Sequence, residues 1–220
     1  MDPYRAFGAL GLAYLLGAVP FGYILVMIKT GEDIRGIQSG RTGGTNAMRA
    51  AGFGTGLATG ILDILKGFFA VSIARIFVPD SQLIWALAPV MAVIGHNYSI
   101  YMVSVKDGKI RLGGGAGGAT VLGGAMGLWP QSFLIIFPIG ILIFYFIGYA
   151  SVTTMSLAVM SLLVFGWRSF ALGQPWEYML FGAISIFLLL YALRPNLKAL
   201  RAGTERLHGF RARGKKKATS

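Results

Sequence analysis

Two polar, glycine-rich stretches carry the groups best suited to binding an anion. The first reads SGRTGGTN from Ser39 to Asn46, and an arginine follows three residues later. Glycines let successive backbone N–H groups turn into one concavity, and hydroxyl and amide side chains add further donors. A phosphate needs donors from several directions, so this composition predicts a phosphate site, with a flexible connector as the alternative. The candidate ligands are Ser39, Gly40, Arg41, Thr42, Gly43, Thr45, Asn46 and Arg49.

The second stretch reads GGGAGGAT from Gly113 to Thr120, and Lys109 and Arg111 precede it. Its backbone amides can also surround an oxyanion, where Thr120 opens the next helix. Small residues that pack helices recur at spaced positions, whereas these glycines are consecutive, which favours a binding loop over a packing motif. The alternative is a purely mobile loop. The candidate ligands here are Arg111, Gly114, Gly115, Gly117 and Thr120.

Single polar residues near apolar segments add further candidates. His96, in GHNYSIY, is a candidate base or phosphate contact, or it hydrogen-bonds a neighbouring helix. Asp63 and Lys66 are three residues apart on one helical face, which favours a structural ion pair over a substrate-organising role. The other histidine, His208, is predicted to be solvated in a basic tail. Turns near span ends contribute Ser151, Thr154 and Asn196 as possible phosphate donors.

The elements that position these groups are membrane spans. The chain has 220 residues, of which 55% are hydrophobic and only 13% charged, so a polytopic membrane protein is predicted. The first run is too long for a signal-peptide core and is read as a retained span. The fourth is short and is expected to be tilted or partly re-entrant. The predicted spans are Ala6–Ile28, Phe53–Val78, Gln82–Val103, Ala116–Leu128, Gln131–Tyr149, Val152–Trp167 and Trp176–Leu193.

The distribution of basic residues orients these spans. Of 20 Lys and Arg residues, 16 fall in the segments 29–52 and 105–115 and in the tail after Leu193. Basic loops stay in the cytoplasm, so the N-terminus is predicted outside and the C-terminus inside. We therefore expect an all-α integral membrane fold of seven transmembrane helices, with one membrane domain over 1–205 and a basic tail over 206–220. The run Lys215–Lys217 is expected to attract anionic lipid.

These segments, in this order, resemble the bacterial acyl-phosphate:glycerol-3-phosphate acyltransferase family. The resemblance rests on GAVPFGYI at 17–24, DIRGIQSGRTGGTNAMRAAG at 33–52, LDILKG at 62–67, GHNY at 95–98, GGAT at 117–120 and RPNLKALRAGTE at 194–205. It implies a seven-helix enzyme of the bacterial plasma (inner) membrane whose active site faces the cytoplasm. The enzyme would move a fatty acyl group from acyl-phosphate to the 1-hydroxyl of glycerol-3-phosphate, which gives lysophosphatidic acid. No metal, cofactor, acyl-CoA or nucleic acid is implied, and the oligomeric state stays open.

The chain departs from the family pattern at five motif positions, one of which is Gly44 in place of an alanine of the first motif. Arg41 replaces an asparagine of the first motif, and Leu193 replaces a histidine of the third. Gly113 and Ala116 replace the two lysines of the second. Each lost charged hydrogen bond is worth about 1.5–3 kcal/mol, so replacements are needed, and Arg41 and Arg111 are the candidates.

On this resemblance, we expect each of the two substrate phosphates to bind to its own set of residues. The donor phosphate would rest in the 113–120 loop, while Ser39, Arg49, Thr154 and Asn196 would hold the acceptor phosphate. Either His96 or a phosphate oxygen would take the hydroxyl proton; the assigned catalytic residues are His96, Ser39 and Arg49. Two alternatives stay open. The loops could bind an anionic lipid or phosphate without turnover, or acylate a different polyol phosphate.

Overall fold

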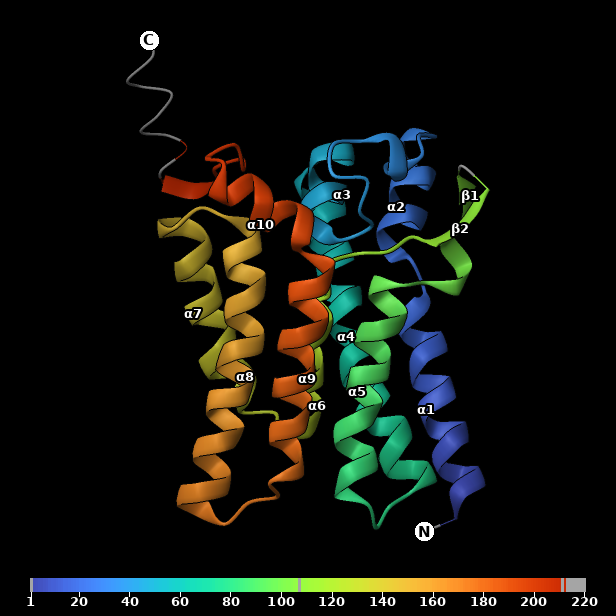
Figure 1. Ribbon diagram of the computed structural model, residues 1–220, viewed down its shortest axis with the longest axis vertical. Coiled ribbons are helices and arrows are strands. Elements are labelled where there is room, and N and C mark those ends of the chain that lie inside the picture. The colour runs from blue at the N-terminus through green and yellow to red at the C-terminus, as the bar shows by residue number, and fades with distance from the viewer. Residues whose placement is uncertain (1, 107, 211, 213–220) are drawn as a thin grey trace.

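The structure is a computed structural model that describes residues 2–106, 108–210 and 212 (Figure 1). Within those residues the chain forms an upright bundle of helices with one small hairpin at an end. The helices are α1 (Pro3–Ala18), α2 (Phe21–Thr30), η1 (Ile34–Gly36), α3 (Gly44–Ala51), α4 (Phe53–Phe77), α5 (Gln82–Asn97), η2 (Ile100–Met102), α6 (Gly118–Leu128), α7 (Ser132–Phe146), α8 (Ala150–Leu172), α9 (Glu177–Ala192) and α10 (Arg194–Arg201). The strands are β1 (Val103–Lys106) and β2 (Lys109–Leu112).

The outer surface of the bundle is apolar, as expected of a chain surrounded by lipid. Phe7, Leu134 and Phe187 are all more than 70% exposed. Four helical segments are long and apolar enough to cross a membrane, and a fifth is obtained if α9 and the bent α10 are counted together. Among the described residues, α6 and α7 are shorter apolar helices. The predicted membrane class is therefore confirmed.

The first predicted span is divided into α1 and α2. The break lies at Val19 and Pro20, where proline has no N–H to donate to the preceding turn. Together Pro3–Thr30 still forms one apolar segment of 28 residues. The last span ends in a similar way, because α10 begins with Arg194 and Pro195 and turns by 67° from α9.

Helix α6 lies at the centre of the bundle and is almost entirely buried. Its 11 residues extend for only about 16 Å, roughly half the thickness of a bilayer core. A Cβ atom at Gly123 would come within 1.8 Å of the carbonyl oxygen of Ile64, so only glycine allows α4 and α6 to approach this closely. Around α6, buried side chains of α4, α5, α8 and α9 form the main apolar core, which includes Val93, Phe165 and Phe181. The short predicted helix is therefore a buried half-length helix that starts at the second glycine-rich stretch.

The segment predicted as a loop over 105–115 is partly a hairpin, which corrects the purely helical expectation. β1 and β2 pair antiparallel with Val103 opposite Leu112 and Ser104 opposite Arg111. The apolar residues Val103, Val105, Ile110 and Leu112 are exposed along it, so the pairing rests on backbone hydrogen bonds and cross-strand contacts.

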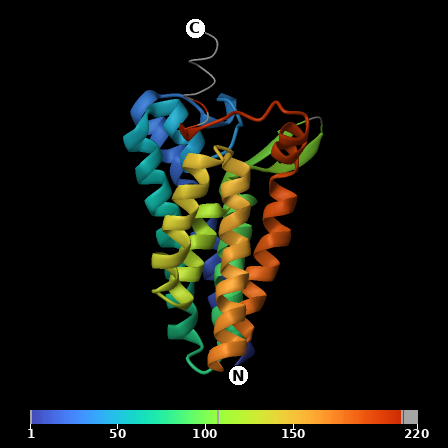
Figure 2. The ribbon, with the colours of Figure 1, turned by 90° about the vertical axis from the view of Figure 1, so that its left-hand side faces the viewer.

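The polar segments gather at one end of the bundle. Figure 1 shows α3, the hairpin and α10 at the end opposite to the start of α1, and Figure 2 shows the same arrangement from the side. Residues 202–210 continue from α10 and fold back over the turn between α7 and α8, where the N–H of His208 donates to the carbonyl oxygen of Gly148. The predicted tail therefore begins as packed structure. The Lys215–Lys217 run lies outside the described residues.

Candidate functional site

A cavity of about 780 Å³ lies at the polar end of the bundle. Its wall is made by the loop before α3, by α3, α4, α6, α7 and α8, and by α10 with the segment that follows it. Both glycine-rich stretches reach it. The predicted site residues that line the cavity are Ser39, Arg41, Gly43, Thr45, Asn46, Arg49, His96, Gly117, Ser151, Thr154 and Asn196.

The first glycine-rich stretch is held in shape by Asn46. The side-chain amide of Asn46 donates to the carbonyl oxygens of Ile37, at 3.0 Å, and Arg41, at 2.9 Å. Asn46 is itself 3% exposed, so its amide group serves to hold the loop together. Helix α3 begins at Gly44, and no described group accepts a hydrogen bond from the backbone N–H of Gly44 or Thr45. The stretch therefore turns the positive end of a helix toward the cavity.

The second stretch is fixed by backbone hydrogen bonds and ends in another free helix start. The N–H of Gly115 donates to the carbonyl oxygen of His96 at 2.9 Å, and that of Gly113 donates to Met102 at 3.1 Å. For the N–H groups of Ala116, Gly117 and Gly118 the described residues supply no acceptor. Because α6 starts at Gly118, these three amides form an open set of donors at its positive end.

Arg41 supplies a cation between the two stretches. Its guanidinium donates to the carbonyl oxygen of Ala192, at the end of α9, and lines the cavity. Burial lowers the pKa of Arg41 from its ordinary value, an effect that leaves an arginine protonated at neutral pH. Ala192 directly precedes Leu193, so this contact places Arg41 beside Leu193 at the end of α9. Thr154 lies on the far side of the second stretch, where a Cβ atom at Gly118 would come within 3.2 Å of its hydroxyl oxygen.

Arg49 is the second cation of the cavity. It lies in the last turn of α3, five residues after the helix begins at Gly44. Its Nη2 atom lies 2.7 Å from Nε2 of His208. Its buried Nε has no hydrogen-bond partner among the described residues. A buried guanidinium N–H without an acceptor costs free energy, so Arg49 keeps an unsatisfied donor at the polar end of the cavity.

Glu205 accepts hydrogen bonds from two of the predicted ligands, Ser151 and Asn196. It was not among the residues predicted from the sequence. Its carboxylate accepts a hydrogen bond from the Ser151 hydroxyl at 2.6 Å and from the Ser151 backbone N–H at 3.3 Å. The amide of Asn196 also donates to it, at 3.4 Å. A carboxylate is favoured at the positive start of α8, so an acidic residue within a basic tail was the available signal.

His96, Asp63 and Lys66 form a buried cluster beneath the second stretch. Lys66 Nζ lies 2.9 Å from Asp63 Oδ1, and the predicted ion pair is confirmed. His96 Nδ1 lies 3.5 Å from the same oxygen, and Lys66 also donates to the carbonyl oxygen of Val19 at 3.1 Å. A Cβ atom at Gly115 would come within 2.0 Å of His96 Nε2. The histidine ring therefore fills the space directly under the loop.

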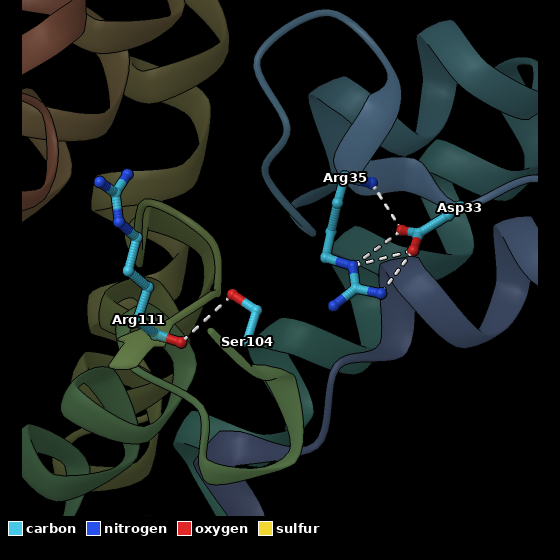
Figure 3. A network of polar contacts seen from close by, with 4 residues as sticks. All are labelled: Asp33, Arg35, Ser104 and Arg111. Atoms are coloured by element: carbon cyan, nitrogen blue, oxygen red, sulfur yellow. Dashed lines mark hydrogen bonds and ion pairs between the residues drawn. The ribbon is translucent and has the colours of Figure 1, made fainter. Parts of the chain in front are cut away.

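Several predicted residues lie away from the cavity wall. Gly40, Thr42, Gly114, Gly115 and Thr120 form or support the backbone of the two stretches. Arg111 lies on the exposed strand β2, where its main-chain oxygen accepts a hydrogen bond from Ser104 and its guanidinium extends away from Ser104 (Figure 3). The structure therefore does not bring Arg111 into the cavity with Arg41 and Arg49. In the same view Arg35 pairs with Asp33 through Nη2 and Oδ2, 2.5 Å apart.

The cavity continues from its polar end into an apolar groove. This part is lined by side chains of α4 and α7, including Leu57, Ile61, Ile141 and Phe144. Leu57, Ile61 and Ile141 are about half exposed on the surface that faces lipid. The cavity is therefore amphipathic, with cations and backbone amides at one end and hydrocarbon at the other. Among the described residues there is no cluster of three or more His, Asp or Glu side chains able to hold a metal.

Comparison with known sequences identifies a family. The profile described as "Glycerol-3-phosphate acyltransferase" matches residues 7–203. A protein of that name from Thermus thermophilus is 39% identical over 202 residues, which cover 91% of this chain and 94% of the relative. Another, from Syntrophomonas wolfei, is 36% identical and covers 88% of this chain and 92% of the relative.

Two solved structures resemble the chain over most of its length. Both are described as crystal structures of PlsY (YgiH), an integral membrane glycerol 3-phosphate acyltransferase. The glycerol 3-phosphate form has a TM-score of 0.79 and 29% identity, and the match covers 93% of this chain and 96% of that one. The lysophosphatidic acid form has a TM-score of 0.76 and 28% identity, covering 93% and 95%.

Proposed function

The chain belongs to the glycerol-3-phosphate acyltransferase family, and from this premise we propose how its cavity carries out acyl transfer. Its activity is the transfer of a fatty acyl group to glycerol-3-phosphate, a step of phospholipid synthesis in a membrane. The donor is an acyl-phosphate, the acceptor atom is the 1-hydroxyl oxygen and the product is lysophosphatidic acid. The observation that carries the proposal is that two glycine-rich stretches and two arginines meet at one end of an amphipathic cavity.

The protein crosses the inner membrane of a bacterium seven times, and its cavity opens to the cytoplasm. Counting α1 and α2 together, seven apolar helical segments support this count, and the short α6 completes its crossing together with the non-helical stretch 113–117 before it. The polar end carries Lys29, Arg35, Arg41, Arg49 and further basic residues, whereas Arg5, Arg75 and Arg168 lie on α1, α4 and α8 near the opposite end. An excess of Lys and Arg marks the cytoplasmic side.

The orientation has a direct test because the chain contains no cysteine. Ser104→Cys places a thiol on the hairpin, and Ser81→Cys places one in the turn before α5 at the opposite end. In intact cells, a membrane-impermeant maleimide should label the Ser81→Cys variant and spare the other until the cells are opened. The reverse labelling pattern would contradict the proposed orientation.

The acyl-phosphate binds across the two parts of the cavity. Its hydrocarbon chain lies in the apolar groove between α4 and α7, and its phosphate lies at the amides of Ala116, Gly117 and Gly118. Arg41 provides the charge that the second stretch lacks, since its guanidinium lies between that stretch and the end of α9. The start of α6 and one cation then face the donor phosphate.

Glycerol-3-phosphate binds on the side of Arg49. Its phosphate accepts hydrogen bonds from the guanidinium of Arg49, whose Nε has no described partner, and from the hydroxyl of Ser39 on the loop before α3. Thr154 and Asn196 complete this half of the site, and Glu205 keeps Ser151 and Asn196 in place. The relative solved in its glycerol 3-phosphate form supports this choice of acceptor.

The acyl-transfer step requires little acid–base assistance, because acyl-phosphate is a mixed anhydride from which phosphate leaves easily. The acceptor oxygen forms a bond to the acyl carbon, the acyl carbon–oxygen bond to phosphate breaks, and inorganic phosphate leaves. Of the two candidate proton acceptors, the buried position of His96 under Gly115 favours a phosphate oxygen. Orientation of the two anions and stabilisation of the developing charge therefore supply most of the rate acceleration.

The proposal is tested with purified protein, acyl-phosphate and glycerol-3-phosphate, with lysophosphatidic acid as the measured product. Arg49→Ala should raise the KM for glycerol-3-phosphate by about tenfold or more, since a charged hydrogen bond is worth about 1.5–3 kcal/mol. Arg35→Ala is the matched control, because Arg35 pairs with Asp33 away from the cavity. Full activity of the Arg49→Ala variant, or no product from the unmodified protein, would exclude the proposed site.

A further inference from the structure

We propose that His208 is a positioning residue for the acceptor phosphate: its neutral imidazole holds Arg49 without cancelling its charge. The segment 204–210 would then be part of the active site and not a detached tail. The inference rests on the proposed function, in which Arg49 binds glycerol-3-phosphate. The family profile matches residues 7–203, so His208 lies beyond the matched part of the chain.

The contact between His208 and Arg49 joins distant parts of the chain. Arg49 Nη2 donates to His208 Nε2 at 2.7 Å, between residues 159 positions apart. Both residues line the cavity. Since an arginine only donates hydrogen bonds, His208 Nε2 must be the acceptor, and the ring carries its proton on Nδ1. The imidazole is therefore neutral in this contact.

A neutral partner suits an arginine that must bind an anion. A carboxylate in the same place would compete with the phosphate for the guanidinium. The nearby acidic group, Glu205, is engaged with Ser151 at 2.6 Å, and no ion pair joins Arg49 to an acidic side chain in the part of the chain that the structure describes. His208 fixes one end of the guanidinium fork, while Nε stays without a partner on the buried side. The charge of Arg49 is thereby kept for a ligand.

The position of His208 is built into the packing of residues 204–210. Its ring stacks on Phe144 of α7, with centroids 5.2 Å apart. The backbone N–H of His208 donates to the carbonyl oxygen of Gly148 at 2.8 Å. The neighbouring Gly209 has φ of +61°, and a Cβ atom there would come within 2.3 Å of the carbonyl oxygen of Tyr145. Close packing against the turn between α7 and α8 therefore fixes the ring beside Arg49.

Two substitutions separate positioning from simple packing. His208→Phe keeps an aromatic ring to stack on Phe144 but has no acceptor for Arg49. His208→Gln gives up the aromatic stacking but offers a side-chain oxygen at a reach similar to Nε2. If the imidazole positions Arg49, His208→Phe should raise the KM for glycerol-3-phosphate about tenfold with kcat changed less than about twofold, and His208→Gln should recover most of the loss.

The outcomes distinguish this inference from the proposed function. Phe210→Ala is the matched control, because Phe210 belongs to the same segment and its side chain is exposed. If the KM of the His208→Phe variant equals that of the unmodified protein while Arg49→Ala is impaired, the inference is wrong and the proposed site stands. If His208→Gln is as impaired as His208→Phe, or worse, the ring acts through packing and the inference is wrong. Thermal unfolding of each variant in detergent shows whether the bundle stays folded.

Discussion

The backbone N–H of Thr42 donates to the carbonyl oxygen of Gly114 at 3.2 Å, and this bond ties the first glycine-rich stretch directly to the second. The stretches are separated by α3, α4, α5 and the hairpin in the chain. Their junction brings the starts of α3 and α6 to one cavity, so that two phosphates can be held close together. Juxtaposing two anions needs cations nearby, and Arg41 and Arg49 both line this cavity.

Replacing Arg41 by an uncharged residue should impair the reaction with acyl-phosphate. Arg41→Ala is expected to lower kcat/KM for acyl-phosphate by about tenfold to a hundredfold, the effect of losing one charge-assisted hydrogen bond. Arg41→Lys should retain part of the activity, because it keeps the charge without the guanidinium fork. Steady-state kinetics measures this when each substrate is varied in turn while the other is held saturating. A fall that affects only the KM for glycerol-3-phosphate would assign Arg41 to the other phosphate.

A methyl group at Gly115 should disturb the second stretch. Gly115→Ala would place a Cβ atom 2.0 Å from Nε2 of His96, whose ring is buried and held near Asp63. The loop must move, so acyl transfer should fall strongly and the melting temperature should decrease. Gly36→Ala is the control, because a Cβ atom there meets nothing within 4 Å. Wild-type activity of the Gly115→Ala variant would mean that the loop geometry is not required.

Breaking the buried ion pair should destabilise the protein. Lys66→Met leaves the Asp63 carboxylate without its cation 2.9 Å away, at a site that is 2% exposed or less. The loss of one partner of such a pair costs about 3–5 kcal/mol, whereas removing both charges costs much less. The double variant Asp63→Asn with Lys66→Met should therefore be more stable than Lys66→Met alone. Thermal unfolding in detergent decides this, and additive losses would argue against a coupled pair.

Acid should weaken the contact between His208 and Arg49. Burial, and then the nearby charges of Arg49 and Arg206, lower the pKa of His208 from its ordinary value of 6.5, against a smaller opposing effect of Glu205. A lowered pKa means that the stabilising contact is complete above the ordinary value and is lost as pH falls through the folded-state pKa. Protonated His208 no longer accepts from Arg49.

The KM for glycerol-3-phosphate should therefore rise at acidic pH by more than protonation of the substrate alone explains. His208→Gln lacks the titrating group and should show only the substrate's contribution. The measurement is the ratio of the two KM values from about pH 5 to pH 8, which brackets an ordinary histidine. A ratio of the wild-type KM to the variant KM that falls as the pH is lowered would contradict a neutral acceptor at His208.

The amino-acid sequence by itself determined the class of protein and the two main ligand stretches. Long apolar runs have few arrangements other than membrane helices, since backbone groups in lipid must be paired internally. Consecutive glycines beside hydroxyl residues are equally local signals, and they placed Ser39, Arg41 and Gly117 at the cavity. The Asp63–Lys66 pair followed from helical spacing alone.

Only the tertiary structure decided which distant side chains meet. Arg111 is close to the second stretch in sequence, but the pairing of β1 with β2 carries it to an exposed strand away from the cavity. His208 belongs to a segment that reads as a solvated tail, but the fold-back over the turn between α7 and α8 brings it to Arg49. Such contacts depend on how whole helices pack and on where a chain reverses, and these are set by interactions between residues far apart in the sequence.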